Sequence, residues 1–138
     1  MRVSQRLDYA LRALTALAQQ PEGRPMVAGD LARDLGLPKR FLEQQITALG
    51  KRGLVSCQRG ASGGCVLARS PDLVTVADVV RAVQGEVLDV PHRTGSASSE
   101  MWLDVARALE DVLGSVTLRQ LAKRQTELDA AAVPMYYI

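Results

Sequence analysis

Residues 38–69 read PKRFLEQQITALGKRGLVSCQRGASGGCVLAR, and this stretch decides the fold. Its first half predicts a helix, because Leu42, Ile46 and Leu49 recur at the i, i+4 and i+7 spacing of one buried face. Pro38 suits the first helical position, where its missing N–H costs no hydrogen bond. The remaining positions are mostly polar, so we expect the opposite face of this helix to point outward.

A short hairpin is predicted after the helix, which we expect to stop at Gly53. The runs 54–59 and 65–69 are strand-like, and the glycine-rich segment GASGG at 60–64 joins them. A polar helix face followed by a hairpin with an arginine, Arg59, beside its tip is the layout of a winged helix-turn-helix. Such a helix can enter the major groove of double-stranded DNA while the hairpin reaches a neighbouring groove.

The residues before this stretch supply the other helices of that layout. A helix is predicted from about Gln5 to Gln20 with Ser4 as its N-cap, and a short one from Ala28 to Leu35. Gly36 then allows a tight turn into the next helix. A helix, a short turn with glycine and a second helix have helix-turn-helix spacing.

The chain after the hairpin predicts three more helices. Thr75 and Thr117 begin patterns of the capping-box type, for helices over 76–83 and from 118 to about 128. The polar segment 90–99 is expected to be a mobile loop.

The helix between these two, over 100–113, carries a long apolar stripe. This stripe predicts that the helix pairs with a second copy of the chain. The winged helix-turn-helix domain needs only residues 1–84, which is too little to cover that stripe. We therefore expect residues 85–138 to form a loop, a long dimerisation helix and a C-terminal helix with a tail. The alternative is that the long helix folds back on its own domain. The expected fold class is mainly α with a small β-hairpin.

The composition indicates a folded protein, since 47% of the 138 residues are hydrophobic. No apolar run is long enough to cross a bilayer, and charges interrupt the N-terminus, so we expect a cytoplasmic location. The 17 basic and 15 acidic residues give a net charge of only +2, so a nucleic-acid footprint depends on clustering. The clustered basic residues are Lys39, Arg40, Lys51, Arg52, Arg59 and Arg69.

Four segments resemble the Rrf2 family of bacterial transcription regulators. They are DYALRAL at 8–14, RFLEQQITALGKRGLV at 40–55, RGASGGCVLAR at 59–69 and VTVADVVRAVQG at 74–85. The resemblance covers nearly the whole chain and includes a helix similar to the dimerisation helix of the family. It implies a homodimeric DNA-binding regulator, acting as a repressor, whose recognition helices read a palindromic operator about one DNA turn apart.

By the same resemblance, Arg40, Glu43 and Gln44 face the major groove, and Arg59 enters the minor groove. The chemistry agrees, because a carboxylate accepts from the cytosine amino group, amide and guanidinium groups donate to base edges, and a narrow minor groove attracts arginine. The alternative is that Arg40 and Glu43 form only a solvated ion pair. The expected DNA-binding residues, with the two lysines on phosphates, are Lys39, Arg40, Glu43, Gln44, Lys51, Arg59, Gly60 and Ser62.

The loop at 89–100 departs from the pattern of the family. Many members hold an iron–sulfur cluster through three cysteines in the loop before the dimerisation helix, and this loop contains none. We therefore expect no iron–sulfur cluster and no bound metal. Asp8 matches an unusual carboxylate ligand of some members and His92 lies in the loop. We interpret them as a helix-terminal charge and a surface histidine.

The two cysteines fall in the predicted hairpin instead. If the hairpin centres near Ala61, then Cys57 and Cys65 lie opposite each other on adjacent strands. Opposed cysteines can approach closely enough for a disulfide, which makes a thiol-redox-sensing regulator one hypothesis. The alternative is that both are small apolar residues that fill the wing.

Two other functional classes compete with DNA binding. An enzyme is not expected, because His92 has no nucleophile or carboxylate motif beside it, and GASGG joins two strands instead of preceding a helix. A winged helix that contacts only other proteins is the second class, and the salt dependence of DNA binding distinguishes it. The sequence does not identify the effector: a small ligand between the winged domain and the long helix and the absence of any ligand are both open.

Overall fold

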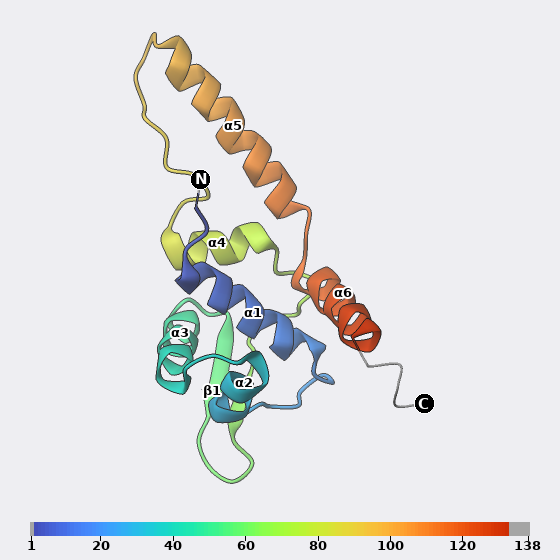
Figure 1. Ribbon diagram of the computed structural model, residues 1–138. Coiled ribbons are helices and arrows are strands. Elements are labelled where there is room, and N and C mark those ends of the chain that lie inside the picture. The colour runs from blue at the N-terminus through green and yellow to red at the C-terminus, as the bar shows by residue number, and fades with distance from the viewer. Residues whose placement is uncertain (1, 133–138) are drawn as a thin grey trace.

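The structure, a computed structural model, describes residues 2–132, and Figure 1 shows their arrangement. The elements in chain order are α1 (Gln5–Gln19), α2 (Ala28–Leu35), α3 (Lys39–Lys51), β1 (Val55–Gln58), β2 (Gly64–Leu67), α4 (Val76–Gln84), α5 (Ala97–Gly114) and α6 (Leu118–Ala131). The predicted fold class is confirmed: the chain is mainly helical with one antiparallel hairpin. The last six residues of the predicted tail lie outside the described residues.

Helix α1 forms the centre of the fold, in contact with α2, α3, α4, α6 and β2. Its inward face includes Ala10, Ala13 and Leu14, all completely buried. The alanines let neighbouring helices approach closely, and the leucines supply most of the apolar area removed from water. The core therefore lies around α1, between the helix-turn-helix on one side and α4 and α6 on the other.

Helix α3 buries the predicted stripe of Leu42, Ile46 and Leu49. Its predicted start was wrong by one residue, because Pro38 is the N-cap. Pro38 keeps an extended ψ of 125° while its carbonyl accepts the first helical hydrogen bond, from the N–H of Leu42 at 3.0 Å. Gly53 ends the helix as predicted, just after the C-cap residue, with a left-handed φ of 75°.

The predicted capping boxes are both present. The Thr75 hydroxyl accepts from the Asp78 N–H at 3.1 Å, and Thr117 does the same for Gln120 at 3.2 Å. The start of α5 was predicted three residues too late, because Ser96 caps it and makes residues 97–99 helical instead of part of the loop. Helix α2 has the predicted bounds, and the ends of α1, α4, α5 and α6 differ from the predicted ones by one to three residues.

The hairpin has the predicted register, with Cys57 opposite Cys65 and Val55 opposite Leu67. The two cysteines form a disulfide. Met26, which precedes α2, adds a single bridge on the other edge of β2. Its N–H donates to the Cys65 carbonyl at 3.0 Å, and its carbonyl accepts from the Cys65 N–H at 2.7 Å. The wing is thereby attached to the helical body at Cys65.

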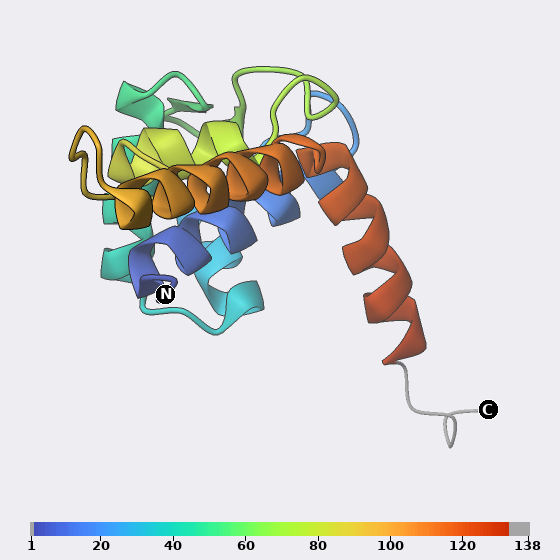
Figure 2. The same cartoon turned by 90° about the horizontal axis from the view of Figure 1, so that it is seen from above.

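Helix α5 projects from the body as an arm, and Figure 2 shows α6 following the C-terminal end of α5, next to the body, at a steep angle to it. Only one residue of α5, Ser99, is buried, although the helix contacts α4 along one side. Helix α6 behaves differently, because it packs on α1 and buries Leu118 and Ala122 in the main core. It thus shares the core of the unit that was predicted to end at residue 84.

Candidate nucleic-acid interface

The outward face of α3 presents the side chains that the sequence predicted for DNA contact. Arg40, Glu43 and Gln44 are exposed, as are Lys39 and Lys51 at the two ends of the helix. The helix is held from behind, because its apolar stripe packs against α1 and α2, and its end contacts β1. The polar face is therefore accessible on a rigid support, as insertion into a groove requires. The DNA contacts themselves stay a prediction.

The ion pair on this face differs from the alternative considered from the sequence. Glu43 pairs with Lys39, one helical turn earlier, with 3.8 Å between Oε1 and Nζ. Arg40 makes no ion pair within residues 2–132. An exposed pair of this kind contributes little stability and is screened by salt, so the carboxylate stays available to another donor.

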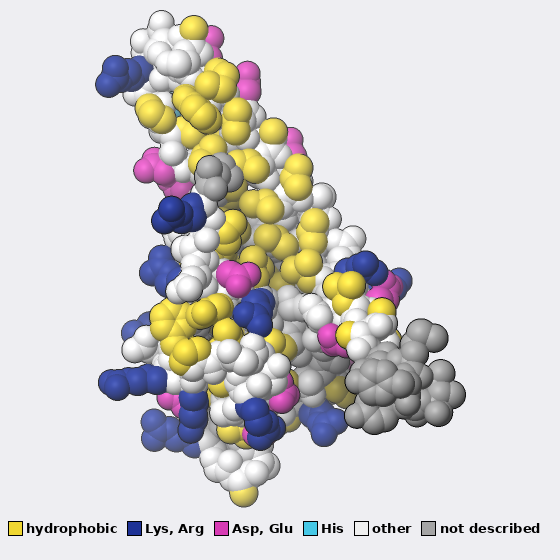
Figure 3. Space-filling model, viewed as in Figure 1, with side chains coloured by type: hydrophobic (Ala, Val, Ile, Leu, Met, Phe, Trp, Pro, Cys, Tyr) yellow, Lys and Arg dark blue, Asp and Glu magenta, His cyan; other side chains and the backbone are white. Residues whose placement is uncertain are grey.

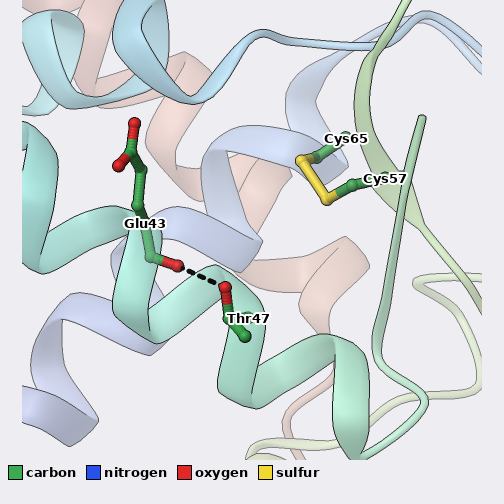
Figure 4. Close-up of a disulfide and its surroundings, with 4 residues drawn as sticks. All are labelled: Glu43, Thr47, Cys57 and Cys65. Atoms are coloured by element: carbon green, nitrogen blue, oxygen red, sulfur yellow. Dashed lines mark hydrogen bonds between the residues drawn. A yellow bond between two sulfur atoms is a disulfide. The ribbon is translucent and has the colours of Figure 1, made fainter. Parts of the chain in front are cut away.

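Thr47 lies one turn after Glu43 on the same face. Its hydroxyl donates to the Glu43 carbonyl at 2.9 Å, as the dashed line in Figure 4 shows. The hydroxyl proton is therefore used within the helix, which leaves Thr47 its hydroxyl oxygen as an acceptor and its methyl group for an apolar contact. An apolar contact of this kind suits the methyl group of thymine. Sequence reasoning gave Thr47 no role in binding.

The wing places Arg59, Gly60 and Ser62 in solvent at the far end of the hairpin. Its sharp tip depends on glycine, because a Cβ at Gly63 would collide with the backbone of Gln58 and Gly60. Gly64 has a left-handed φ of 136°, and a Cβ there would lie 3.0 Å from the Met26 backbone. These two glycines bend the chain so that the arginine stands free beside the tip.

Charge is distributed unevenly over the surface. Figure 3 shows Lys and Arg side chains gathered over the half of the molecule that holds α3 and the hairpin, with apolar side chains along α5. All six clustered basic residues are exposed, namely Lys39, Arg40, Lys51, Arg52, Arg59 and Arg69. A cluster of this kind attracts a polyanion even though the whole chain carries a net charge of only +2.

The chain matches the Rrf2 family, described as "Iron-dependent Transcriptional regulator", over residues 3–124. It belongs to this family. The match includes the helices α1 to α5, the wing and the first half of α6. The chain is therefore a helix-turn-helix transcription regulator of the Rrf2 family, a class of DNA-binding proteins.

Individual relatives agree with this assignment. The chain is 33% identical to the transcriptional regulator CymR of Bacillus subtilis over 124 residues, which cover 88% of this chain and 90% of CymR. It is 31% identical to IscR of Xenorhabdus nematophila over 95% of this chain and 85% of that one. These relatives are transcription regulators and not enzymes.

Solved structures give the same result for the fold. The structure of B. subtilis CymR, described as the global cysteine regulator, superposes with a TM-score of 0.82 at 32% identity, over 90% of this chain and 98% of that one. T. potens IscR superposes with a TM-score of 0.80 at 34% identity, over 99% and 96%. The winged helix-turn-helix architecture is thus shared with proteins of known structure.

The residues of this chain do not fit the iron site that the family description implies. Loop 89–100 has no thiol, and both cysteines are joined in the wing. Within residues 2–132, no three His, Cys, Asp or Glu side chains are grouped as metal ligands. Asp8 and His92 are exposed side chains on α1 and on the loop before α5. Iron–sulfur clusters are held mostly by thiolates, and loop 89–100 has none to offer.

Two features of the site could not have been found by sequence reasoning. Met26 lies between Pro25 and Val27 without a strand pattern, so nothing in the sequence indicates that it would join the hairpin edge. The choice between Lys39 and Arg40 as the partner of Glu43 also depends on side-chain geometry, because both spacings are allowed on a helix.

Among the described residues, no helix is long and apolar enough to span a membrane.

Proposed function

We propose that this chain is a cytoplasmic, homodimeric repressor that binds a palindromic operator and works without an iron–sulfur cluster. One observation carries the proposal. Helix α3, with its exposed polar face, and the adjoining wing lie at the same end of the molecule, away from the α5 arm (Figure 1), and the wing carries the exposed Arg59.

Each side chain has a role in this proposal. Glu43 accepts from a cytosine amino group, and Gln44 and Arg40 donate to base edges in the major groove. Arg59 enters the minor groove, where a narrow A·T-rich segment has a strongly negative potential. Lys39 and Lys51 neutralise phosphates, which adds affinity without sequence choice, and Gly60 and Ser62 let the backbone of the wing approach the duplex.

The proposed dimer rests on the exposed apolar side chains of α5. Met101, Trp102 and Val112 are 46%, 43% and 62% exposed, which is unusual for three large apolar side chains on one helix. Pairing of two α5 helices would cover them and produce a two-fold axis. Two α3 helices would then enter successive major grooves, about 34 Å apart, and binding over a promoter would exclude the polymerase.

A footprinting and affinity experiment tests the proposal. Genomic fragments bound by the purified chain are footprinted, and affinity is then measured over a range of salt concentrations. We expect a two-fold symmetric site and a steep linear fall of log affinity with log salt. Arg59→Ala should weaken binding and lose protection at the flanks of the site. Arg124→Ala removes the same charge from α6 and should bind as the wild type does.

Other results would point elsewhere. Binding that shows salt dependence but no preferred site would contradict the sequence-specific function. Absence of DNA binding at low salt would favour a winged helix that contacts only proteins. Iron or acid-labile sulfide in protein purified without oxygen would contradict the cluster-free form, for which metal analysis and an absorbance spectrum suffice.

The disulfide favours a second candidate function, a regulator that senses thiol oxidation. Cys57 and Cys65 are bonded in the wing, and Cys57 is two residues from the arginine proposed for the minor groove. In a reducing cytoplasm such bonds are usually transient or redox-sensing and seldom structural. If the affinity for the operator is the same in the presence and absence of a thiol reductant, this candidate is excluded.

A further inference from the structure

The wing contains a covalent bond that groove recognition does not require. Cys57 and Cys65 are the only cysteines of the sequence, and the disulfide joins them across the two strands (Figure 4). Their Cα atoms are 4.1 Å apart. The bond closes the segment that contains Arg59 and the glycine tip, so its presence or absence determines how freely that segment moves.

The two cysteines are held very differently. Cys65 is only 6% exposed, and both of its backbone polar groups bond to Met26, outside the hairpin. Cys57 is exposed, in a strand where only Val55 is buried. One half of the disulfide therefore belongs to the helical body and the other half faces solvent.

The backbone does not duplicate the link between these two residues. In an antiparallel pair, opposed residues alternate between those that exchange N–H···O bonds and those that do not. The N–H and carbonyl of Cys65 point toward Met26, so Cys57 and Cys65 form a non-hydrogen-bonded pair. The sulfur atoms are thus the direct connection at this level of the hairpin, and opening the disulfide leaves the exposed strand with fewer restraints.

We propose that Cys57 is the site at which the wing exchanges with low-molecular-weight thiols and disulfides. A small thiolate attacks the sulfur of Cys57, the exposed residue of the pair, forming a mixed disulfide on Cys57 and releasing Cys65 as a thiolate that takes up a proton. A second thiolate attacks the sulfur of the small-molecule part, so that Cys57 leaves as a thiolate and is protonated. In sum, one protein disulfide and two small thiols give two protein thiols and one small disulfide, and the same steps run in reverse during oxidation.

The effect on DNA rests on the proposed function. The disulfide restricts the conformations open to residues 58–64. Less conformational entropy is therefore lost when Arg59 enters the minor groove. The oxidised form should bind the operator about threefold to tenfold more tightly than the reduced form, because a few side chains and a loop are ordered in advance.

An exchange assay without DNA tests the site. The variants Cys65→Ala and Cys57→Ala each keep one thiol, and intact-mass spectrometry follows the addition of one glutathionyl group from oxidised glutathione. Cys57 should react at least about tenfold faster than Cys65, because access limits the attack. In denaturant the two variants should react at similar rates, which controls for intrinsic reactivity. Equal rates in the folded variants, or faster reaction at Cys65, would overturn the assignment.

A binding assay tests the consequence. Operator affinity is measured for wild type and Arg59→Ala, each reduced with dithiothreitol or oxidised with oxidised glutathione. The wild type should lose affinity on reduction, and Arg59→Ala should not respond, since the disulfide acts through that arginine. Equal wild-type affinities, or an undiminished response in Arg59→Ala, would contradict the coupling. Absence of specific binding in both forms overturns the proposed function and the coupling together, while the exchange assay decides the site at Cys57 separately.

Discussion

Helices α3 and α5 carry the same kind of apolar stripe, but only α3 buries its stripe within the chain. Leu42 and Leu49 of α3 are 0% and 2% exposed, whereas large apolar side chains of α5 remain in solvent. Amphipathic periodicity thus predicts that a helix forms and which face is apolar. It does not say whether that face meets the same chain or another one. Here the buried stripe orients a recognition surface, and we infer that the open stripe pairs two such surfaces.

The largest stability effect is expected in α3. Leu49→Ala should lower the free energy of unfolding by about 2–5 kcal/mol, because it removes a buried side chain and leaves a cavity. Leu73→Ala, at an exposed leucine, should change it by no more than about 0.5 kcal/mol. Urea denaturation followed by circular dichroism measures both. Similar values for the two variants would mean that the core is not where the structure places it.

A substitution in the stripe of α5 should weaken the association of two chains, where the one in α3 weakens the fold. Val112→Asp puts a charge on the open stripe and should weaken self-association at least about tenfold, since burying an unpaired charge costs desolvation free energy. Arg107→Ala, on another face of the same helix, should associate normally. Analytical ultracentrifugation over a concentration series distinguishes them. A dimer that Val112→Asp leaves intact would place the interface elsewhere.

The carboxylate of Asp78 at the start of α4 predicts a pH effect. Arg81 bonds Asp78 at 3.2 Å and Glu110 of α5 at 2.9 Å. The pKa of Asp78 is lowered, first by the hydrogen bond from the Thr75 backbone and also by Arg81. A lowered folded-state pKa means that the carboxylate stabilises the fold above its ordinary value of 3.8, and this contribution is lost as pH falls through the folded-state pKa.

Asp78→Asn should therefore reduce stability at neutral pH, and the difference from wild type should shrink as the pH is lowered below that ordinary value. Denaturant unfolding of both proteins across this range measures the difference. A difference that stays constant or grows on acidification would show that the charge of Asp78 is not what stabilises the start of α4.

The smallest stability effect is expected on the outward face of α3. Glu43→Gln breaks an exposed pair with Lys39 and should change the free energy of unfolding by less than about 0.5 kcal/mol. The same substitution should alter the base preference at one operator position, because an amide both donates and accepts. Unchanged preference in a selection from randomised operators would remove Glu43 from the recognition set.

Much of this molecule could be predicted from local pattern alone. The stripe of α3, the capping residues Thr75 and Thr117, and the glycine that ends α3 each act within a few residues of sequence, and all are observed. The register of the hairpin followed from its glycine tip.

What the sequence could not predict depends on contacts between distant segments. The packing of α6 on α1 and the bridge from Met26 to Cys65 join residues far apart in the chain and carry no local signal. The disulfide was one of two alternatives, because opposed cysteines pack equally well as thiols. The exposure of α5 likewise depends on what the rest of the chain leaves uncovered.

The central claim is that the open α5 stripe pairs two copies so that two α3 helices reach one operator. Sedimentation velocity of the chain with a footprinted operator duplex, for wild type and Val112→Asp, tests it most directly. We predict a complex of two chains per duplex for wild type, and for Val112→Asp a loss of operator affinity with the fold retained. A wild-type complex of one chain per duplex, or equal operator affinity for both proteins, would contradict the claim.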